Sequence, residues 1–180
     1  MAARGVTVVL MVGLPGSGKT TRARQLEAEG ALRFSLDEWM LPLFAGENGT
    51  RQRDTLEGRL IWAGLRAAEL GVDVVLDFGF WSRAERDALR HLFAAVGAEC
   101  VVEFLDVDPT TQWERVSRRQ VEAPGDTFAM TRGELDHWRT LFEVPTAEEL
   151  ATTTNGPPAG FLTWSAWAAD RWPSLPDQGR

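Results

Sequence analysis

The chain has 180 residues, 44% of them hydrophobic, so we expect one domain spanning residues 1–180 with a substantial core. Its formal net charge of −7 argues against non-specific binding to nucleic acid or to anionic membrane surfaces. The one cysteine, Cys100, cannot form an internal disulfide, and zinc-ligand spacing is absent. Because no segment is long enough to cross a membrane and the apolar N-terminal run lacks a cleavage site, we expect a cytoplasmic protein.

The first predicted elements surround a phosphate-binding motif. Residues 6–12 form a continuous apolar run, which is typical of a strand buried on both faces of a parallel sheet. Residues 20–29 have the pattern of a helix. Between them lies the P-loop pattern G-x-x-x-x-G-K-[ST], formed by Gly13, Leu14, Pro15, Gly16, Ser17, Gly18, Lys19 and Thr20. Strand, glycine loop and helix in this order are the context that the motif requires, so we expect these eight residues to bind ATP.

The residue types within the motif explain this expectation. The glycines let backbone N–H groups turn toward phosphate oxygens, and the helix N-terminus adds partial positive charge. Lys19 is the only lysine in a chain with 18 arginines, and its compact ammonium can reach between phosphates where a planar guanidinium is too broad. Thr20 places a hydroxyl where Mg²⁺ is expected. We therefore predict Lys19 as a catalytic phosphate anchor and Thr20 as a metal ligand.

Strands and helices alternate along the next part of the chain. We predict a short strand at 32–35, a loop at 40–55, and a helix from 51 to 70 that ends at Gly71. A third strand follows at 72–77, and a helix from 82 to 96 opens with the capping box Ser82–Glu85. This alternation predicts an α/β fold with a mainly parallel sheet.

The same alternation continues toward the C-terminus, although no convincing fifth strand is visible. We predict a strand at 99–107 and then a helix with Asp108 as its N-cap. A loop at 122–128 leads to a helix at 131–142, and a capping box opens at Thr146. Residues 161–172 are predicted as a last helix with tryptophan anchors.

Two aspartates at predicted strand ends are candidates for chemistry, because ligands of α/β sheets bind at the carboxyl ends of the strands. Asp37 follows the second strand, and we expect it to act as the base on an acceptor hydroxyl. Asp77 closes the third strand, and we expect it to serve Mg²⁺ in the manner of a Walker B carboxylate. The structural alternatives are a helix N-cap for Asp37 and a turn residue for Asp77.

A pair of arginines is the candidate phosphate clamp. Arg115 and Arg119 are four residues apart, so they share one face of the predicted helix. They precede a loop that could close over the nucleotide, and guanidinium groups form bidentate contacts with phosphate. We therefore predict a lid at 112–135 with catalytic and ATP-binding roles for both, and we expect Arg118 to point elsewhere. The alternative is a solvated basic face.

The four residues that directly follow Asp77 are Phe78–Trp81. We expect their aromatic rings to lie beside the acceptor site. They could form the wall of a substrate pocket or belong to ordinary core packing, and the sequence does not choose between these interpretations.

Together these residues resemble the small P-loop kinases of the polynucleotide kinase, chloramphenicol phosphotransferase and zeta-toxin type. The resemblance covers residues 5–145 and includes the P-loop, Asp37, and Leu105–Pro109 with the arginine-bearing helix after it. It implies a P-loop NTPase three-layer sandwich, with a parallel sheet of four to five strands, a helical lid, and Asp37 as the base. Because these families share a fold and differ in substrate, the fold does not choose the acceptor.

The sequence thus predicts an ATP- and Mg²⁺-dependent kinase that phosphorylates a hydroxyl of a small molecule. The alternatives are a polynucleotide 5′-hydroxyl kinase, which the acidity disfavours, and a P-loop ATPase with no phosphoryl acceptor. A GTPase is excluded because its guanine-reading Asn-Lys-x-Asp motif needs a second lysine.

Overall fold

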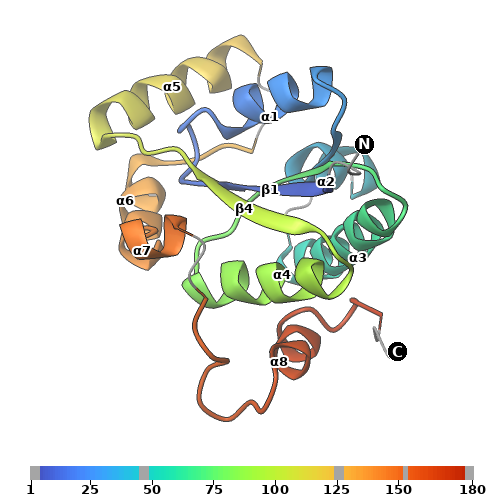
Figure 1. The fold of residues 1–180 in the computed structure, drawn as a ribbon. Helices are drawn as coiled ribbons and strands as arrows, with labels where there is room; N and C mark the ends of the chain where they lie inside the picture. The colour runs from blue at the N-terminus through green and yellow to red at the C-terminus, as the bar shows by residue number, and fades with distance from the viewer. Residues whose placement is uncertain (1–4, 45–48, 124–127, 152–153, 177–180) are drawn as a thin grey trace.

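The computed structural model of the chain describes residues 5–44, 49–123, 128–151 and 154–176. Its centre is one sheet of four strands in the order β2–β3–β1–β4 (Figure 1). Every neighbouring pair is parallel. The strands are β1 (Thr7–Val12), β2 (Leu32–Ser35), β3 (Val74–Gly79) and β4 (Glu99–Phe104). The predicted α/β fold with a parallel sheet is confirmed, with four strands in the described part of the chain.

Helices cover both faces of this sheet and form the outer layers (Figure 1). Helices α1 and α5 lie on one side of the sheet, while α3 and α4 lie on the other, and α8 packs on the outside of α4. The helices are α1 (Lys19–Ala28), α2 (Leu36–Leu43), α3 (Thr50–Glu69), α4 (Arg83–Ala95), α5 (Pro109–Glu122), α6 (Arg132–Leu141), α7 (Ala147–Leu150) and α8 (Trp164–Arg171).

The apolar run of β1 is buried on both faces because alternate side chains enter different layers. Val8 and Leu10 belong to the large core shared with α3, α4 and α8. Met11 points to the other face, where it packs with Ala23 of α1 and Val75 of β3. Because both faces are buried, this strand shows no alternation of polar and apolar residues. The same packing fixes the position of the P-loop at the carboxyl end of the strand.

The structure corrects two predicted boundaries next to the site. Residues 40–55 were predicted as a loop, but α2 occupies 36–43 and α3 begins at 50, while 45–48 lie outside the described residues. Helix α2 contains Pro42 as its next-to-last residue. Strand β3 continues two residues past Asp77, because Gly79 pairs with Val12 and accepts a hydrogen bond from the Gly13 N–H at 3.3 Å. Asp77 therefore lies inside the strand and does not end it.

The C-terminal segment forms part of the core. The predicted helix at 161–172 is observed as the shorter α8, with Thr163 as its N-cap. Trp164 and Trp172 are buried in the main core, and Trp167 lies edge-on to both rings at 5.8 Å. None of the helices in the described ranges is both long and apolar enough to span a membrane.

Candidate functional site

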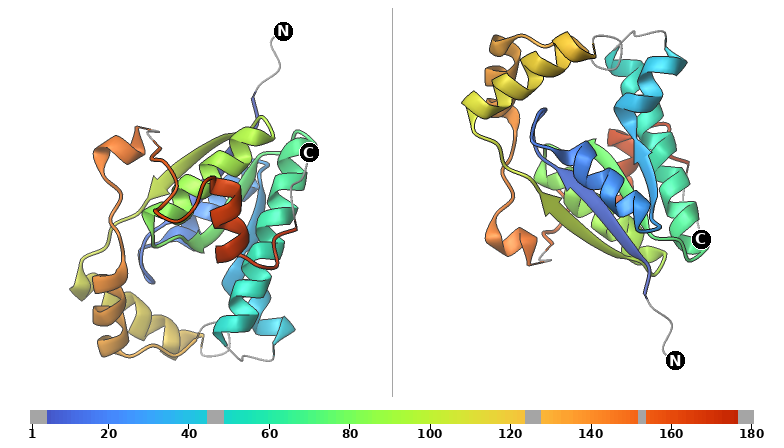
Figure 2. Two further views of the ribbon diagram at one scale, coloured as in Figure 1. Left: turned by 90° about the horizontal axis from the view of Figure 1, so that it is seen from below. Right: turned by 90° about the horizontal axis from the view of Figure 1, so that it is seen from above.

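A cleft of about 940 Å³ opens at the carboxyl ends of β1 and β3. Residues of the P-loop, α2, α3 and α5 line it. In the ribbon of Figure 2, α5 lies across from α2 and α3. All predicted site residues line this cleft except Leu14, which is buried beneath it. The structure therefore brings the predicted residues of the P-loop, α2, β3 and α5 into one site.

The P-loop backbone has the shape that its glycines allow. Gly13 has φ +146°, and a Cβ there would lie 2.4 Å from the Leu105 carbonyl oxygen. Gly18, with φ +101°, directly precedes the first residue of α1. The Ser17 hydroxyl is buried without a hydrogen-bond partner among the described residues. The loop thus presents the start of a helix and an unpartnered hydroxyl, which fits the binding of a phosphate chain.

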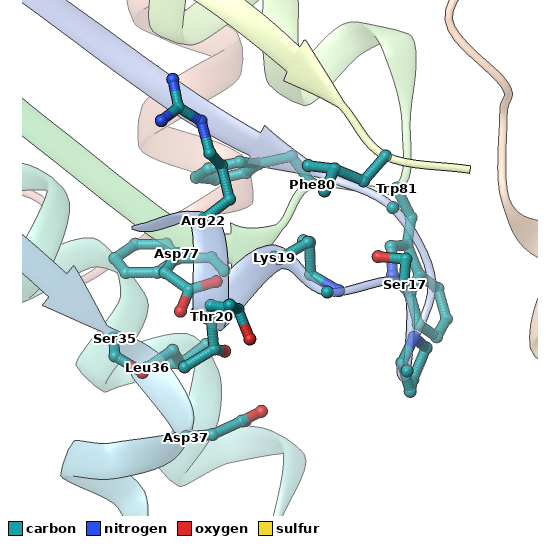
Figure 3. Close-up of a pocket in the computed structure, with 18 of the residues that line it drawn as sticks. Ser17, Lys19, Thr20, Arg22, Ser35, Leu36, Asp37, Asp77, Phe80 and Trp81 are labelled. Atoms are coloured by element: carbon teal, nitrogen blue, oxygen red, sulfur yellow. The ribbon is translucent and has the colours of Figure 1, made fainter. Parts of the chain in front are cut away.

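Lys19 lies within this loop, with its ammonium group close to the loop backbone (Figure 3). Its Nζ donates a hydrogen bond to the Leu14 carbonyl at 2.9 Å. Burial lowers the pKa of Lys19 to about 8, while the negative charges of Asp77 and Asp37 oppose that shift. The negative charge of a bound polyphosphate would stabilise the protonated form of this buried amine.

Asp77 and Thr20 lie side by side beneath the P-loop (Figure 3). Asp77 stands opposite Ser35 in the sheet and is 7% exposed. Burial raises the pKa of Asp77, while a hydrogen bond from Thr20 and the charges of Lys19 and Arg33 lower it. The distance from Asp77 Oδ2 to Arg33 Nη1 is 3.5 Å, too long for a good hydrogen bond, and this oxygen has no hydrogen-bond partner among the described residues.

This pair fits Mg²⁺, which is usually held by one or two carboxylates together with phosphate oxygens and waters. A buried carboxylate beside a hydroxyl supplies that kind of donor set, and Asp77 Oδ2 accepts no hydrogen bond from the described residues, although it lies 3.5 Å from the Arg33 guanidinium. Within the described ranges, no group of three or more acidic, histidine or cysteine side chains is arranged to hold a metal ion, so those residues offer no complete protein cage.

Asp37 occupies a different environment on α2. It lies in the first turn of the helix, whose N-cap is Ser35, so the alternative N-cap role for Asp37 is wrong. Its side chain is 60% exposed toward the cleft and accepts a hydrogen bond from Arg53 Nη1 at 2.8 Å. The two aspartates therefore differ as their expected roles require, because Asp77 is buried beside Thr20 whereas Asp37 is accessible.

Helix α5 begins where expected and docks directly on the P-loop. The Asp108 carboxylate caps it by accepting hydrogen bonds from the N–H groups of Thr110 and Thr111. Gln112 Nε2 donates to the Pro15 carbonyl at 2.9 Å, and Arg115 Nη1 donates to the Gly16 carbonyl at 3.2 Å. The first half of the helix is thus attached to the nucleotide-binding loop.

The expectation that Arg118 points elsewhere is wrong. Arg118 lines the same cleft as Arg115 and Arg119, with its Nε 4.0 Å from a Glu122 oxygen. Positions three apart on a helix are neighbours as much as positions four apart, so all three arginines fall on one side of α5. Residues 124–127 of the predicted lid lie outside the described residues.

Both interpretations of the aromatic segment hold in part. Phe80 is 3% exposed and belongs to the core, Phe78 and Trp81 are half-buried and pack against it, and all three line the cleft. Phe80 has φ +31°, unusual for a bulky residue, and its carbonyl accepts a hydrogen bond at 3.0 Å from the fully buried Arg86. Arg86, which no sequence pattern marked, thereby holds the turn that places the rings.

Five charged residues of α3, α4 and α8 also line the cleft, and the sequence did not mark them as site residues. They are Arg53, Asp54, Glu57, Glu85 and Arg171. Arg53 and Asp54 lie where the predicted loop at 40–55 overlaps the predicted helix at 51–70. Glu85 is the predicted capping-box residue, and Arg171 comes from the C-terminal helix. No local motif signals any of them, because they meet only through the packing of α3, α4 and α8.

Comparisons with known proteins agree with this architecture. Residues 8–145 match a family described as AAA domain. A search of curated proteins finds no match. In the Pnkp1/Rnl/Hen1 RNA repair complex, one chain is similar with a TM-score of 0.66 and 14% identity, over 84% of this chain and 47% of that one. The present chain therefore spans about half the length of that protein.

Two other solved structures match over most of both chains. Kti12 from Chaetomium thermophilum, in complex with ADP-AlF3, has a TM-score of 0.62 and 18% identity, over 94% of this chain and 99% of that one. A sugar kinase from Janibacter has a TM-score of 0.56 and 21% identity, over 81% of this chain and 82% of that one. At these identities the likeness shows the fold, which is that of P-loop kinases.

Proposed function

Because the chain belongs to the AAA domain family, we propose that it is an ATP- and Mg²⁺-dependent kinase acting on a hydroxyl of a small molecule. The observation that carries this proposal is the position of Asp37. An accessible carboxylate shares one cleft with the P-loop lysine, and the cleft extends beyond both along α3. A nucleotide-binding protein with no acceptor would not need a carboxylate at this position.

Different residues of the cleft would have different roles in phosphoryl transfer. The P-loop amides and Lys19 would hold the phosphates of ATP, and Thr20 with Asp77 would hold Mg²⁺. When bound, the metal ion neutralises charge on the phosphate oxygens. Arg115 and Arg119 would contact the transferring phosphoryl group from α5. These assignments rest on the positions of the side chains around the cleft.

Asp37 would orient the acceptor hydroxyl and take its proton. The acceptor oxygen forms a bond to the γ-phosphorus, and the bond from that phosphorus to the β–γ bridging oxygen breaks. ADP leaves, and the products are a phosphate monoester and a proton that passes from Asp37 to solvent. Closure of residues 112–135 would exclude water, which otherwise competes with the acceptor. An enzyme that consumes ATP in this way fits a cytoplasmic location.

Two alternatives are distinguishable in one assay. A polynucleotide 5′-hydroxyl kinase is compatible with the fold shared with the RNA repair protein, and an ATPase would release phosphate to water. The test supplies γ-labelled MgATP with hydroxylated metabolites, nucleosides, antibiotics and a 5′-hydroxyl oligonucleotide, and locates the product by mass spectrometry. We expect a phosphorylated small molecule, whereas label only on the oligonucleotide or only in free phosphate would contradict the proposal.

Asp37→Asn examines the assigned base directly. The amide preserves the shape and removes the basic oxygen, so we expect phosphoryl transfer to fall about 100-fold or more. The dissociation constant of MgATP, measured by calorimetry, should barely change. Glu38→Gln is the matched control, since Glu38 is the neighbouring residue and pairs with Arg24 and Arg33 outside the cleft. A collapse of ATP affinity with unchanged transfer per bound ATP would assign Asp37 to the metal site instead.

A further inference from the structure

The cleft has a second charged region, formed by Asp37 of α2 together with residues of α3, α4 and α8. We call it the acceptor end, and it consists of Asp37, Arg53, Asp54, Glu57, Glu85 and Arg171. Arg53 pairs with Asp37 at 2.8 Å and is followed directly by Asp54 on α3, and all three residues line the cleft, so the Asp37–Arg53 pair lies next to the remaining members. A molecule with its hydroxyl at Asp37 would therefore extend toward Glu57 and Arg171.

The guanidinium group of Arg171 lies close to three carboxylates in this region. Arg171 Nη1 lies 3.2 Å from Asp54 Oδ1, and its Nη2 lies 2.8 Å from Glu85 Oε1. Its distance to Glu57 Oε2 is longer, at 3.5 Å. Glu57 and Glu85 are almost completely buried, while the Asp54 side chain is 39% exposed. Burial raises the pKa of Glu57 to about 7, so Glu57 is partly protonated near neutral pH. The one guanidinium of Arg171 still faces two further carboxylates, Asp54 and Glu85, so the acceptor end retains an attraction for a further cation.

The sign of the charge reverses along the cleft. The nucleotide end is lined by five basic side chains and two carboxylates, whereas the acceptor end is lined by four carboxylates and two guanidinium groups. The nucleotide end comprises Lys19, Arg22, Arg115, Arg118 and Arg119 with Asp77 and Glu122. The positive end suits the phosphates of ATP, while an acceptor that is itself an anion would meet net negative charge beyond Asp37.

We propose that the acceptor is an amine-bearing alcohol, such as an amino sugar or an amino alcohol. Its ammonium group binds Asp54 and Glu57, and one of its hydroxyl groups reaches Asp37. The half-buried Phe78 and Trp81 supply apolar and aromatic surface for the body of the molecule, and aromatic faces also attract ammonium groups. This inference rests on the proposed kinase function and names its substrate class.

A panel of acceptors sorted by charge tests the substrate class. Matched members are glucosamine, glucose and glucuronic acid, then serinol, glycerol and glycerate, with a 5′-hydroxyl oligonucleotide as a polyanion. We expect kcat/KM for the amine-bearing members to exceed that of their uncharged partners by about tenfold or more. Equal or better transfer to the uncharged or anionic members would overturn this inference and leave the kinase function standing. Absence of transfer to every class would instead overturn the kinase function.

Variants of the acceptor end test the binding groups themselves. In Asp54→Asn and in Glu57→Gln we expect KM for the amine-bearing acceptor to rise about tenfold, with KM for MgATP unchanged. In both variants, the ratio of kcat/KM for the amine-bearing acceptor to kcat/KM for its uncharged partner should decrease. A merely structural role would not change this ratio. Asp170→Asn is the matched control, because Asp170 is exposed next to Arg171 and does not line the cleft. An undiminished amine preference in both variants would overturn the assignment.

Discussion

At the scale of single residues, the ammonium group of Lys19 is held in an environment that disfavours its charge. Burial lowers its pKa to about 8, and the carboxylates of Asp77 and Asp37 offset only part of that effect. Phosphate oxygens of a nucleotide would restore the preference for the charged form. Binding of MgATP above about pH 8 should therefore take up a proton, so that affinity falls as the pH rises.

Replacing Lys19 by Met removes this charge-assisted contact. We expect phosphoryl transfer to slow about 100-fold or more, because the contact strengthens as charge develops on the transferring group. The decline of MgATP affinity above about pH 8 should disappear from the variant. Because Lys19 is the only lysine, a lysine-reactive ATP analogue should label one side chain, with protection by MgATP. Undiminished turnover in the variant, at an unchanged melting temperature, would contradict the role.

Glu57 is the second residue whose environment opposes its charge. Burial raises the pKa of Glu57 to about 7, the charge of Glu85 adds to this shift, and the charges of Arg171 and Arg53 oppose it. From about pH 4.5 to 7 the folded protein keeps a proton that the unfolded chain has lost. The folded state thus binds more protons, and stability decreases as the pH rises through this window.

The glutamine variant should lack this dependence. The wild-type free energy of unfolding should fall relative to that of Glu57→Gln by roughly 3 kcal/mol between pH 4 and pH 8. Urea unfolding at stepped pH values measures the difference. Glu148→Gln, at an exposed position on α7, should follow the wild type throughout. Parallel curves for the wild type and Glu57→Gln would show that Glu57 ionises normally in the folded protein.

At the scale of elements, α5 has one attached half and one exposed half. Gln112 is 2% exposed and is held by the P-loop carbonyl of Pro15 and by Arg139 of α6, at 2.9 Å and 2.6 Å. Arg119, about two turns farther along, is exposed at the edge of the cleft. Any closure of the predicted lid would therefore move the later part of α5 and the segment after it more than its anchored start.

Arg119→Ala tests this arrangement. We expect the transfer rate to fall more than the affinity for MgATP, because the guanidinium gains most from charge on the transferring phosphoryl group. Hydrogen exchange across 112–135 should slow when a non-hydrolysable ATP analogue and Mg²⁺ are added. Arg59→Ala is the matched control, since Arg59 is exposed on α3 and does not line the cleft. Equal effects of the two variants, or unchanged exchange, would leave Arg119 as part of a solvated face.

At the scale of the whole molecule, the C-terminal segment joins the core to the acceptor end. Trp172 is fully buried, and the Arg171 guanidinium lies 5.5 Å from the centre of its ring. Helix α8 lies beyond residue 145, where the family match ends. This segment therefore lies outside the matched family region and contributes Arg171 to the cleft.

Removing the tryptophan anchor should affect both stability and the cleft. We expect Trp172→Ala to lower the free energy of unfolding by about 3–5 kcal/mol in chemical denaturation. Because Arg171 would lose its support, KM for the acceptor should rise more than KM for MgATP. Trp39→Ala is the control, since that ring is 46% exposed and should change stability by less than about 1 kcal/mol. A loss confined to MgATP binding would contradict a link between α8 and the acceptor end.

The sequence by itself determined the parallel α/β fold and the nucleotide end of the cleft. These features follow from neighbours along the chain: an apolar strand, glycines that allow a tight loop, and a helix start at Lys19. The capping residues Ser82, Asp108 and Thr131 also marked helix starts correctly, because a cap bonds to N–H groups two or three residues away. Such local rules do not require knowledge of the remaining chain.

Only the tertiary structure decided the acceptor end and the environments of the two aspartates. Arg171 meets Asp54 and Glu57 across 117 and 114 positions of sequence, through the packing of an outer helix that no motif connects to the site. Asp37 and Asp77 both follow short apolar runs, yet one is accessible and the other buried, because α2 begins at once after β2 whereas β3 continues for two residues. Burial and pairing depend on the elements that pack around a residue, so the charges that would select an acceptor emerge only when the chain is folded.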